Sequence, residues 1–463
     1  MDSVTADPLP AALIAVVGAE HVLTDPLLRA SYDVDWTGRF TGRSRCVVRP
    51  GDTAQVAAVL AECARAGAGV VPQGGNTGLV GGSVARGGEV LLSLRRLTGL
   101  GPVEHDSGQV SVGAGATLAA VQQHVRAAGW DVGMDFAARD SATIGGLVAT
   151  NAGGERVLRY GAMRAQVLGV ETVLADGSVV RRMSGLVKDN VGYDLIGLLT
   201  GSEGTLAVIT AVRLRLIRPA RHRTVVVLGM PSMESVIQAL RAAQDGVEGL
   251  EAAEFFLADG LALVCAHRGL PAPFRTTHPA YLLLEAAGGT DQTEALGVAL
   301  PDVGDAAVAT SSADRAALWA YREAHTEAIN ALGVPVKLDV AVPVGALARF
   351  VAELPGVVSA VAAEARTILF GHVAEGNVHV NVVGAPDTSA GGVPGPQPVT
   401  EAVLRRVAAE GGSISAEHGV GVAKVAWVGL SRTAADIAAM RAVKAALDPA
   451  GRLNPGVLFE GGS

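Results

Sequence analysis

The chain has 463 residues, of which 49% are hydrophobic and 18% charged, and this length exceeds a single ordinary core of about 250–300 residues, so two closely joined domains are expected. The formal net charge of −8 and the lack of a clustered basic face exclude a nucleic-acid-binding protein. The three cysteines, Cys46, Cys63 and Cys265, show no CxxC spacing, which excludes a zinc ribbon or a dithiol redox pair and favours a reducing compartment.

The first 218 residues are predicted to form an α+β domain. Their N-terminal segment is acidic where a signal peptide would be basic, so no export signal is expected and a cytoplasmic location follows. Helices are predicted at 53–66 and 117–128, opened by Thr53 and Thr117 as N-caps. Short β-rich runs between glycine turns predict strands at 46–48, 69–71, 90–94, 109–112, 167–174 and 206–216.

A second domain is predicted from residue 219 to residue 430, after Pro219 interrupts an arginine-rich segment. Residues 384–397 are rich in small and turn-forming residues and predict a surface loop. The apolar runs are far shorter than the roughly 20 residues of a membrane helix, so no membrane span is expected. Strands are predicted at 224–228, 281–285, 306–310, 367–372 and 378–382, and helices at 233–244, 313–332 and 399–410.

Four glycine-rich segments lie within the first domain. Their bare backbone N–H groups allow the close approach of an anion, and their repetition indicates one long ligand. The first segment lacks both the Gly-Lys-Ser/Thr of a P-loop and the G-x-G-x-x-G spacing of a nicotinamide-binding turn. The segments are residues 70–84 (VVPQGGNTGLVGGSV), 113–118 (GAGATL), 144–154 (IGGLVATNAGG) and 200–205 (TGSEGT).

The order of these motifs resembles the FAD-binding domain of the vanillyl-alcohol oxidase and p-cresol methylhydroxylase flavoprotein family. The matching elements are PQGGNTG, GAGATL, SATIGGLVATNAGG, RYGAMR and the run of residues 188–210 that ends GSEGTLAVIT, and the resemblance covers the whole chain. It implies an α+β fold with a two-part FAD-binding domain (1–218) and an α/β cap domain with an antiparallel sheet (219–430). A C-terminal helix and turn (431–463) would return to the flavin.

The same resemblance implies which residues meet the cofactor. In some relatives a histidine of the first loop binds the flavin covalently, but residues 73–77 contain no histidine, so non-covalent FAD is expected. The cofactor-binding residues implied are Pro72, Gly74, Gly75, Asn76, Thr77, Gly78, Ser141, Thr143, Gly145, Gly146, Gly204, Ile209 and Asn454.

A candidate metal site lies in the segment GHVAEGNVHV at 371–380. If its flanks are strands of a hairpin, His372 and His379 can meet one ion, and SAEHG at 415–419 offers Glu417 as a third ligand. The pattern is similar to the metal motif of the family's D-lactate, D-2-hydroxyglutarate and glycolate dehydrogenases, which implies zinc or another divalent ion. His418 is then the natural catalytic base, because a neutral imidazole accepts a proton near pH 7. The alternative is that each histidine is an ordinary packed or surface residue.

The substrate carboxylate has candidate ligands in the segment 313–339. Arg322 and Thr326 are four residues apart in the predicted helix, and arginine binds carboxylates bidentately, although a surface ion pair is the alternative. The resemblance implies that Arg322, Thr326 and Lys337 contact the substrate, together with Asn381 and His418 near the metal. By the same resemblance Lys337 pairs with a distal carboxylate and favours a dicarboxylate, whereas without it Lys337 reads equally well as a solvated lysine on an edge strand.

The resemblance therefore implies an enzyme that oxidises a D-2-hydroxy acid such as D-2-hydroxyglutarate by hydride transfer to FAD. An electron-transfer flavoprotein or a quinone is the implied acceptor, and a homodimer is one option for the assembly. Three alternatives stay open: a D-lactate dehydrogenase or glycolate oxidase catalytic subunit, a flavin-binding subunit without activity, and an oxidase that uses oxygen.

Overall fold

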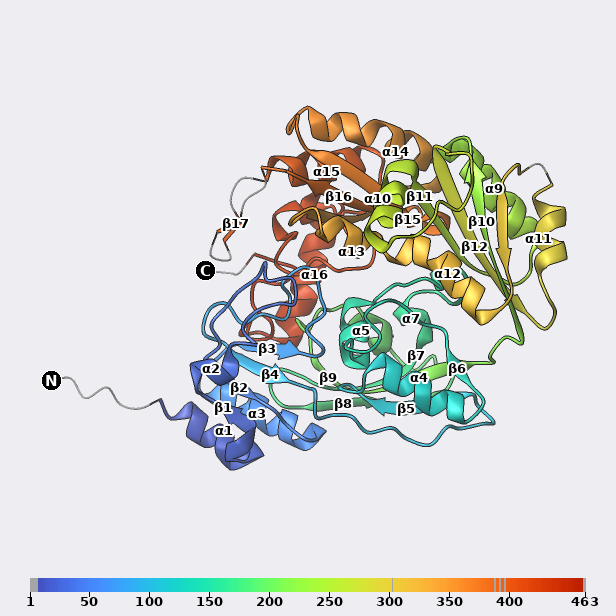
Figure 1. Cartoon of the computed structure of the whole chain (residues 1–463). Coiled ribbons are helices and arrows are strands. Elements are labelled where there is room, and N and C mark those ends of the chain that lie inside the picture. The colour runs from blue at the N-terminus through green and yellow to red at the C-terminus, as the bar shows by residue number, and fades with distance from the viewer. Residues whose placement is uncertain (1–6, 302, 387–388, 391–392, 395–396, 461–463) are drawn as a thin grey trace.

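The computed structural model describes residues 7–301, 303–386, 389–390, 393–394 and 397–460. Within these residues the strands form three main sheets and one short two-stranded pair. The segments up to about residue 217 fill the lower half of Figure 1 and the three-layered region from His222 onward fills the upper half. The C-terminal helix α16 (Ala434–Leu447) then runs back into the lower half.

The N-terminal part contains two of the sheets. The first has the order β1-β2-β4-β3, in which β2, β4 and β3 are parallel and β1 is antiparallel to β2. The second is antiparallel, with the order β5-β9-β7-β8 and β6 paired to β9. Their bounds are β1 Val22–Leu23, β2 Cys46–Val48, β3 Val70–Gln73, β4 Val90–Ser93, β5 Gln109–Gly113, β6 Asp131–Val132, β7 Val167–Val173, β8 Val179–Arg182 and β9 Val208–Ile217.

Two helices of this part test the predicted caps. The helix α4 (Leu118–Ala127) is capped by Thr117, whose side chain accepts a hydrogen bond from the Ala120 N–H, as predicted. The predicted Thr53 cap is wrong, because the N-cap of α3 (Thr53–Arg65) is Asp52, whose carboxylate accepts from the Gln55 N–H. The other helices here are α1 Leu9–Val17, α2 Pro26–Arg29, α5 Ile144–Thr150, α6 Val157–Tyr160, α7 Met163–Gln166 and α8 Leu195–Leu199, with a 3-10 turn at Ala19–His21.

The third sheet is antiparallel throughout, which confirms the expectation for the cap domain. Its order is β13-β10-β12-β11-β15-β16-β14. The strands are β10 His222–Met230, β11 Leu250–Leu257, β12 Ala280–Gly288, β13 Ala306–Ala309, β14 Val336–Ala341, β15 Arg366–His372 and β16 Asn377–Val383. The helices that accompany it are α9 Met233–Gly246, α10 Ala258–Arg268, α11 Thr293–Ala299, α12 Ser312–Glu323, α13 His325–Asn330, α14 Val344–Ser359 and α15 Pro398–Ala409, with 3-10 turns at Val373–Glu375 and Val425–Leu430.

Alternation along the strands buries both faces of this sheet. In β10, Val226 and Leu228 join a core with α9, α14 and α15, whereas Val225 and Val227 face the other way into a cluster with α12 and α13. The site lies on this second face. Strand register places Lys337 opposite Asn381 and Asp339 opposite His379.

The predicted helix 313–332 is wrong as one element, because α12 ends at Glu323 and α13 begins at His325. The buried His325 ring packs between Phe256 and Phe370, and its Nδ1 lies 3.1 Å from the Arg322 carbonyl oxygen. The His325 ring is thus fixed at the point where one helix ends and the next begins.

The predicted surface loop 384–397 lies partly outside the described residues. Its described part contains the short strands β17 (Ser389–Ala390) and β18 (Val393–Pro394). None of the helices in the described part of the chain has both the length and the apolar character that crossing a membrane requires.

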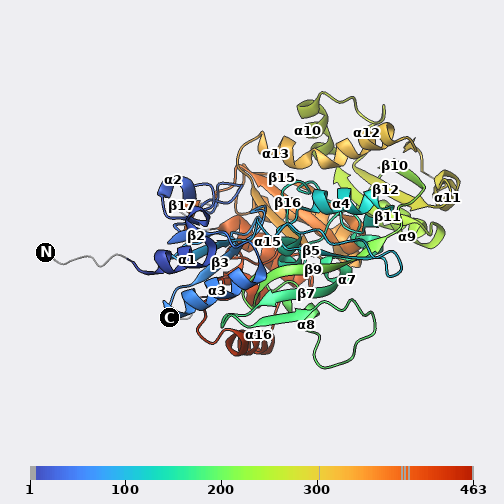
Figure 2. The same cartoon turned by 90° about the horizontal axis from the view of Figure 1, so that it is seen from below.

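The C-terminal segment packs on the N-terminal part. Leu447 of α16 packs against the core of the antiparallel sheet β5–β9, and Leu453 is buried beside β3. Lys444 donates hydrogen bonds to the carbonyl oxygens of Thr205 and Leu453. In the view from below, α16 lies beside α8 and the strands of this part, in agreement with these contacts (Figure 2).

Candidate functional site

A cavity of about 460 Å³ lies between the glycine-rich segments and the second face of the cap sheet. Its volume is typical of sites for cofactors and small molecules. Of the residues predicted from the sequence, Ser141 does not line it. Those that do are Pro72, Gly74, Gly75, Asn76, Thr77, Gly78, Thr143, Gly145, Gly146, Gly204, Ile209, Arg322, Thr326, Lys337, His372, His379, Asn381, Glu417, His418 and Asn454.

The glycines of the first loop allow two loops to touch. A Cβ built on Gly74 would lie 2.3 Å from Thr143 Oγ1, and one on Gly75 would lie 2.1 Å from the Ser141 carbonyl oxygen. The backbone of Ser141 therefore packs against Gly75, and Ser141 is not a lining residue. Only a residue without a side chain permits this approach, which leaves the backbone of both loops open to the cavity.

Thr143 offers an observation that fits a polar ligand. Its Oγ1 is buried and has no hydrogen-bond partner within the described residues. A buried hydroxyl without a partner costs free energy, and a cofactor oxygen or amide would satisfy it. Together with the glycine-lined walls, this residue fits a dinucleotide such as FAD.

Two asparagines hold the loops around the cavity. The Asn76 side chain donates from Nδ2 to the Val34 carbonyl oxygen at 2.8 Å, so its amide ties the first glycine-rich loop to the segment that contains Val34. The Asn454 Nδ2 donates to the carbonyl oxygens of Gly82 at 2.8 Å and Glu203 at 2.6 Å. The C-terminal turn thus clamps two glycine-rich segments together.

Three imidazoles converge on one carboxylate. The Nε2 atoms of His372, His379 and His418 lie 3.8, 3.7 and 3.7 Å from Oε1 of Glu417. The sharp turn between β15 and β16 brings the first two rings together, because Gly376 has φ 67° and its position leaves no room for a Cβ beside the Val342 carbonyl oxygen. The hairpin predicted around this turn is confirmed.

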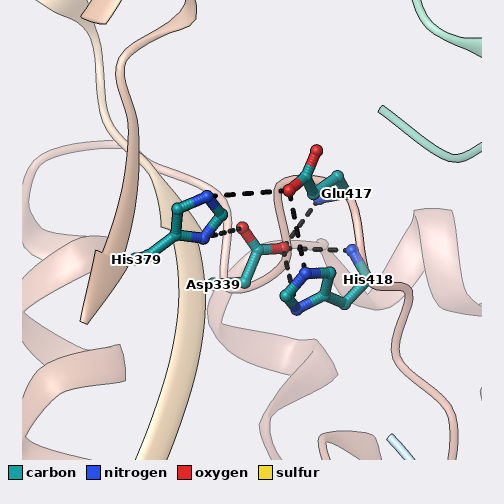
Figure 3. A group of neighbouring side chains, drawn as sticks. All are labelled: Asp339, His379, Glu417 and His418. Atoms are coloured by element: carbon teal, nitrogen blue, oxygen red, sulfur yellow. Dashed lines mark hydrogen bonds and ion pairs between the residues drawn. The ribbon is translucent and has the colours of Figure 1, made fainter. Parts of the chain in front are cut away.

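Asp339 lies between the rings of His379 and His418. Its Oδ1 lies 3.6 Å from Nδ1 of His379, and its Oδ2 lies 3.7 Å from Nδ1 of His418 (Figure 3). The same Oδ2 accepts hydrogen bonds from the backbone N–H groups of Glu417 at 2.8 Å and His418 at 3.0 Å. One buried carboxylate therefore fixes the loop and both rings.

Burial and neighbouring charges shift the pKa values of the side chains in the cluster. Burial lowers the pKa of His379 to about 3, which keeps the ring neutral. Burial acts to raise the pKa of Asp339, but the neighbouring His418 and Lys424 hold it well below its usual range. Asp339 is therefore ionised at neutral pH.

Glu417 is also ionised. Burial acts to raise its pKa, but the adjacent His372 brings it down to about 2. Burial acts to lower the pKa of His372, whereas the carboxylates of Glu254 and Glu417 raise it well above the usual value. Buried carboxylates beside imidazoles form a donor set that suits a divalent cation.

Two overlapping sets of side chains could hold that cation. Asp339, His379, Glu417 and His418 each offer an atom within 4.8 Å of the others. Asp339 does not line the cavity and already accepts several hydrogen bonds, one of them from Asn377 at 2.7 Å. His372 lines the cavity and presents Nε2 to Glu417, so the chemistry of the donors fits His372, His379 and Glu417 better.

The lining of the cavity also includes cationic side chains. Arg322 and Thr326 reach it from successive helices rather than from one, and Lys337 and Asn381 reach it from neighbouring positions on β14 and β16. Burial and the charge of nearby Arg39 lower the pKa of Lys337. Lys337 does lie on an edge strand, but its side chain is half-buried in the cavity.

Sequence reasoning missed two buried carboxylates, Glu254 and Asp339. Each stands inside a mainly apolar strand, in the runs LEAAEFFL and VKLDVA. A carboxylate at such a position is rarely buried without a partner, and this is the signal that could have identified both.

Comparison with known proteins identifies the family. A family model of an FAD binding domain matches residues 44–182, and a model of the C-terminal domain of FAD linked oxidases matches residues 219–458. This chain belongs to the FAD-linked oxidase family. It is an FAD-dependent oxidoreductase, as the order of its glycine-rich motifs led us to expect.

This FAD-linked oxidase is similar over nearly its full length to curated relatives. It is 39% identical over 464 residues to the D-2-hydroxyglutarate dehydrogenase of Xanthomonas citri pv. viticola, covering 98% of this chain and 97% of that relative. It is 40% identical over 448 residues to the mitochondrial D-2-hydroxyglutarate dehydrogenase of Bos taurus, covering 94% and 80%.

Solved structures share the fold. A substrate-bound p-cresol methylhydroxylase superposes with a TM-score of 0.76 at 16% identity, and 4-ethylphenol oxidase from Gulosibacter chungangensis with 0.75 at 18%. Both alignments cover 99% of this chain and 98% of the other. The predicted fold class is confirmed.

Proposed function

We propose that this member of the FAD-linked oxidase family is a dehydrogenase that oxidises D-2-hydroxyglutarate, or a similar D-2-hydroxy dicarboxylate, to the 2-oxo acid. The observation that carries the proposal is the shared cavity in which Arg322 and Lys337 face the same space as the imidazole cluster. Two cationic side chains suit a distal carboxylate, and the imidazole cluster suits the hydroxy-acid group. The names of the curated relatives support the same substrate.

The residues of the chain divide the work of the reaction. Arg322, Thr326 and Lys337 bind the distal carboxylate, and Asn381 and His418 contact the end that reacts. His418 would accept the hydroxyl proton of the substrate, and bound FAD would supply the acceptor for the hydride on the carbon that bears this hydroxyl, so that the C–O bond becomes a carbonyl. Asp339 accepts a hydrogen bond from the His418 backbone N–H and lies 3.7 Å from Nδ1 of the ring, so Nε2 is the atom proposed to accept the proton.

A divalent metal fits His372, His379 and Glu417, and we propose zinc. When bound, it supplies Lewis acidity that lowers the pKa of a hydroxyl group and orients it. The Glu254 carboxylate accepts from Nδ1 of His372, which favours Nε2 of that ring as the ligand atom. Metal dependence is part of this proposal.

Other parts of the expected enzyme belong to the same proposal. FAD is bound without a covalent bond, with Ser141 and the lining residues from Pro72 to Gly78 around it. The electron acceptor is an electron-transfer flavoprotein or a quinone, the assembly is a homodimer and the location is cytoplasmic. The domains are 1–218, 219–430 and 431–463, a division supported by the change of sheet between β9 and β10.

Substrate selectivity tests the function. Purified protein loaded with FAD and zinc is assayed with an artificial electron acceptor against D-2-hydroxyglutarate, D-malate, D-lactate and glycolate. We expect kcat/KM to be highest for D-2-hydroxyglutarate, and Lys337→Ala to lower it far more for that substrate than for D-lactate. A preference for lactate or glycolate, or an equal loss on both classes, would reject the dicarboxylate.

A further inference from the structure

Glu254 is a buried carboxylate on β11 that contacts two residues of the candidate site, His372 and Arg322. Its Oε1 lies 2.6 Å from Nδ1 of His372, and its Oε2 lies 2.8 Å from Nε of Arg322. The side chain is 1% exposed, so neither contact is screened by water. A single residue therefore joins a candidate metal ligand to a candidate ligand of the substrate carboxylate.

The fold fixes Glu254 in this position. It stands directly opposite His372 in the antiparallel pair of β11 and β15. The Arg322 guanidinium also lies over the Phe370 ring, 4.5 Å from its centroid, which holds it from a second side. Neither partner can move far without breaking its contact with Glu254.

The chemistry of the two contacts is the same. A carboxylate only accepts, so Nδ1 of His372 carries its hydrogen toward Glu254, and Nε2, which faces Glu417, is the atom that a metal would use. The bond from Nε of Arg322 orients the guanidinium and leaves its Nη donors for a carboxylate. Both partners are donors, and the carboxylate of Glu254 offers each of them its own acceptor oxygen.

We propose that Glu254 is a positioning residue that couples metal binding to recognition of the distal carboxylate. This inference rests on the proposed function, because it takes Arg322 as the ligand of that carboxylate. Through Glu254, the orientation of His372 toward a metal and the orientation of Arg322 toward a substrate depend on one side chain. Changing it alters zinc affinity and dicarboxylate selectivity together.

Three substitutions separate positioning from simple neutralisation of a buried charge. Glu254→Gln keeps the shape but has one acceptor oxygen, so it can serve only one of the two donors. Glu254→Asp keeps the charge beside Arg322 but is too short to reach both partners, and it guards against a Gln variant that fails to fold. Glu251→Gln is the matched control.

Glu251 suits this comparison because it lies on the same strand and is also fully buried. It pairs with Arg223 at 2.8 Å and Arg159 at 2.9 Å and does not line the cavity. Its replacement by glutamine removes a charged partner of two arginines, as the replacement of Glu254 removes a charged partner of Arg322. A general effect of removing a buried carboxylate would therefore appear in both variants.

Zinc affinity is measured first, by competition with a chromogenic chelator on FAD-loaded protein without substrate. We expect Glu254→Gln and Glu254→Asp to weaken zinc binding by about 10–100-fold, as is typical when the outer partner of a metal-bound histidine is lost. Glu251→Gln lowers the melting temperature without this loss. Unchanged zinc affinity in both Glu254 variants, or an equal loss in Glu251→Gln, would overturn the proposal.

Selectivity is measured next, at saturating zinc. The ratio of kcat/KM for D-2-hydroxyglutarate to that for D-lactate falls in both Glu254 variants and not in Glu251→Gln. An unchanged ratio with weakened zinc binding would assign Glu254 to the metal alone and reject the coupling. Failure of the proposed function is distinct, since it appears in the wild-type protein as zinc binding without oxidation of the dicarboxylate.

Discussion

Gly153 lies directly against Glu417: a Cβ built on Gly153 would lie 2.5 Å from Oε2 and 3.1 Å from Cβ of that glutamate. Gly153 comes from the segment IGGLVATNAGG of the FAD-binding part, whereas Glu417 belongs to the loop after the cap sheet. The flavin-binding part thus shapes the position of a candidate metal ligand.

This contact predicts the effect of one added methyl group. Gly153→Ala displaces the end of the Glu417 side chain, so we expect zinc affinity to fall about tenfold, within the range seen when a ligand's support is lost. Bound FAD, measured by its absorbance at equal protein concentration, stays at the wild-type level. Zinc affinity that matches the wild type would show that Glu417 does not bind the metal in this position.

His418 is predicted to act in the chemical step rather than in binding. His418→Ala removes the proposed base, and we expect turnover to fall by about 10²–10⁴-fold, the usual contribution of a general base. Because FAD and the proposed zinc ligands are untouched, the flavin content and zinc stoichiometry remain those of the wild type. Turnover close to the wild-type rate would remove His418 from the mechanism.

The first glycine-rich loop is predicted to control flavin binding. Gly75→Ala places a methyl group against the Ser141 carbonyl oxygen, and two backbone segments must separate to accommodate it. We expect the purified variant to retain much less FAD than the wild type. Gly99→Ala is the control, because a Cβ at Gly99 would meet nothing within 4 Å. Equal flavin content in all three proteins would argue against this loop as the cofactor site.

Lys337 is predicted to give the reaction an alkaline limit. Burial and Arg39 lower the pKa of Lys337 from the usual 10.5, so its charge is complete at low pH and is lost as pH rises through the lowered value. We expect kcat/KM for D-2-hydroxyglutarate to decline as the pH rises through the lowered pKa of Lys337. Lys337→Arg should abolish the decline, because arginine stays charged. A decline of the same size with D-lactate would point to another group.

The local elements and the candidate site residues were largely predictable. Hydrophobic runs between glycines gave the strands Cys46–Val48 and Ala306–Ala309 to within one residue, because apolar content and turn chemistry are local properties. The convergence of His372 and His379 also followed from a local turn. The break in the helix after Glu323 did not, since no glycine or proline marks it and the His325 ring beside it packs against rings from two distant strands.

Interactions between distant segments could not be predicted from the sequence. Nothing near Glu254 in the chain reveals that it faces His372, because strand order within an antiparallel sheet is a tertiary property. The contact of Gly153 with Glu417 was hidden for the same reason. The first could be recognised only once the strands of the cap sheet were ordered, and the second only once the glycine-rich part and the cap domain were placed together.

Anaerobic reduction of the bound flavin tests the central claim most directly. Purified FAD-loaded protein is mixed with D-2-hydroxyglutarate in the absence of oxygen and of any acceptor, with zinc present or removed by a chelator, and the flavin absorbance is followed in time. We predict rapid bleaching with zinc, slow or no bleaching without it, and little bleaching by D-lactate. A flavin that D-2-hydroxyglutarate leaves oxidised in the zinc-loaded protein would contradict the account.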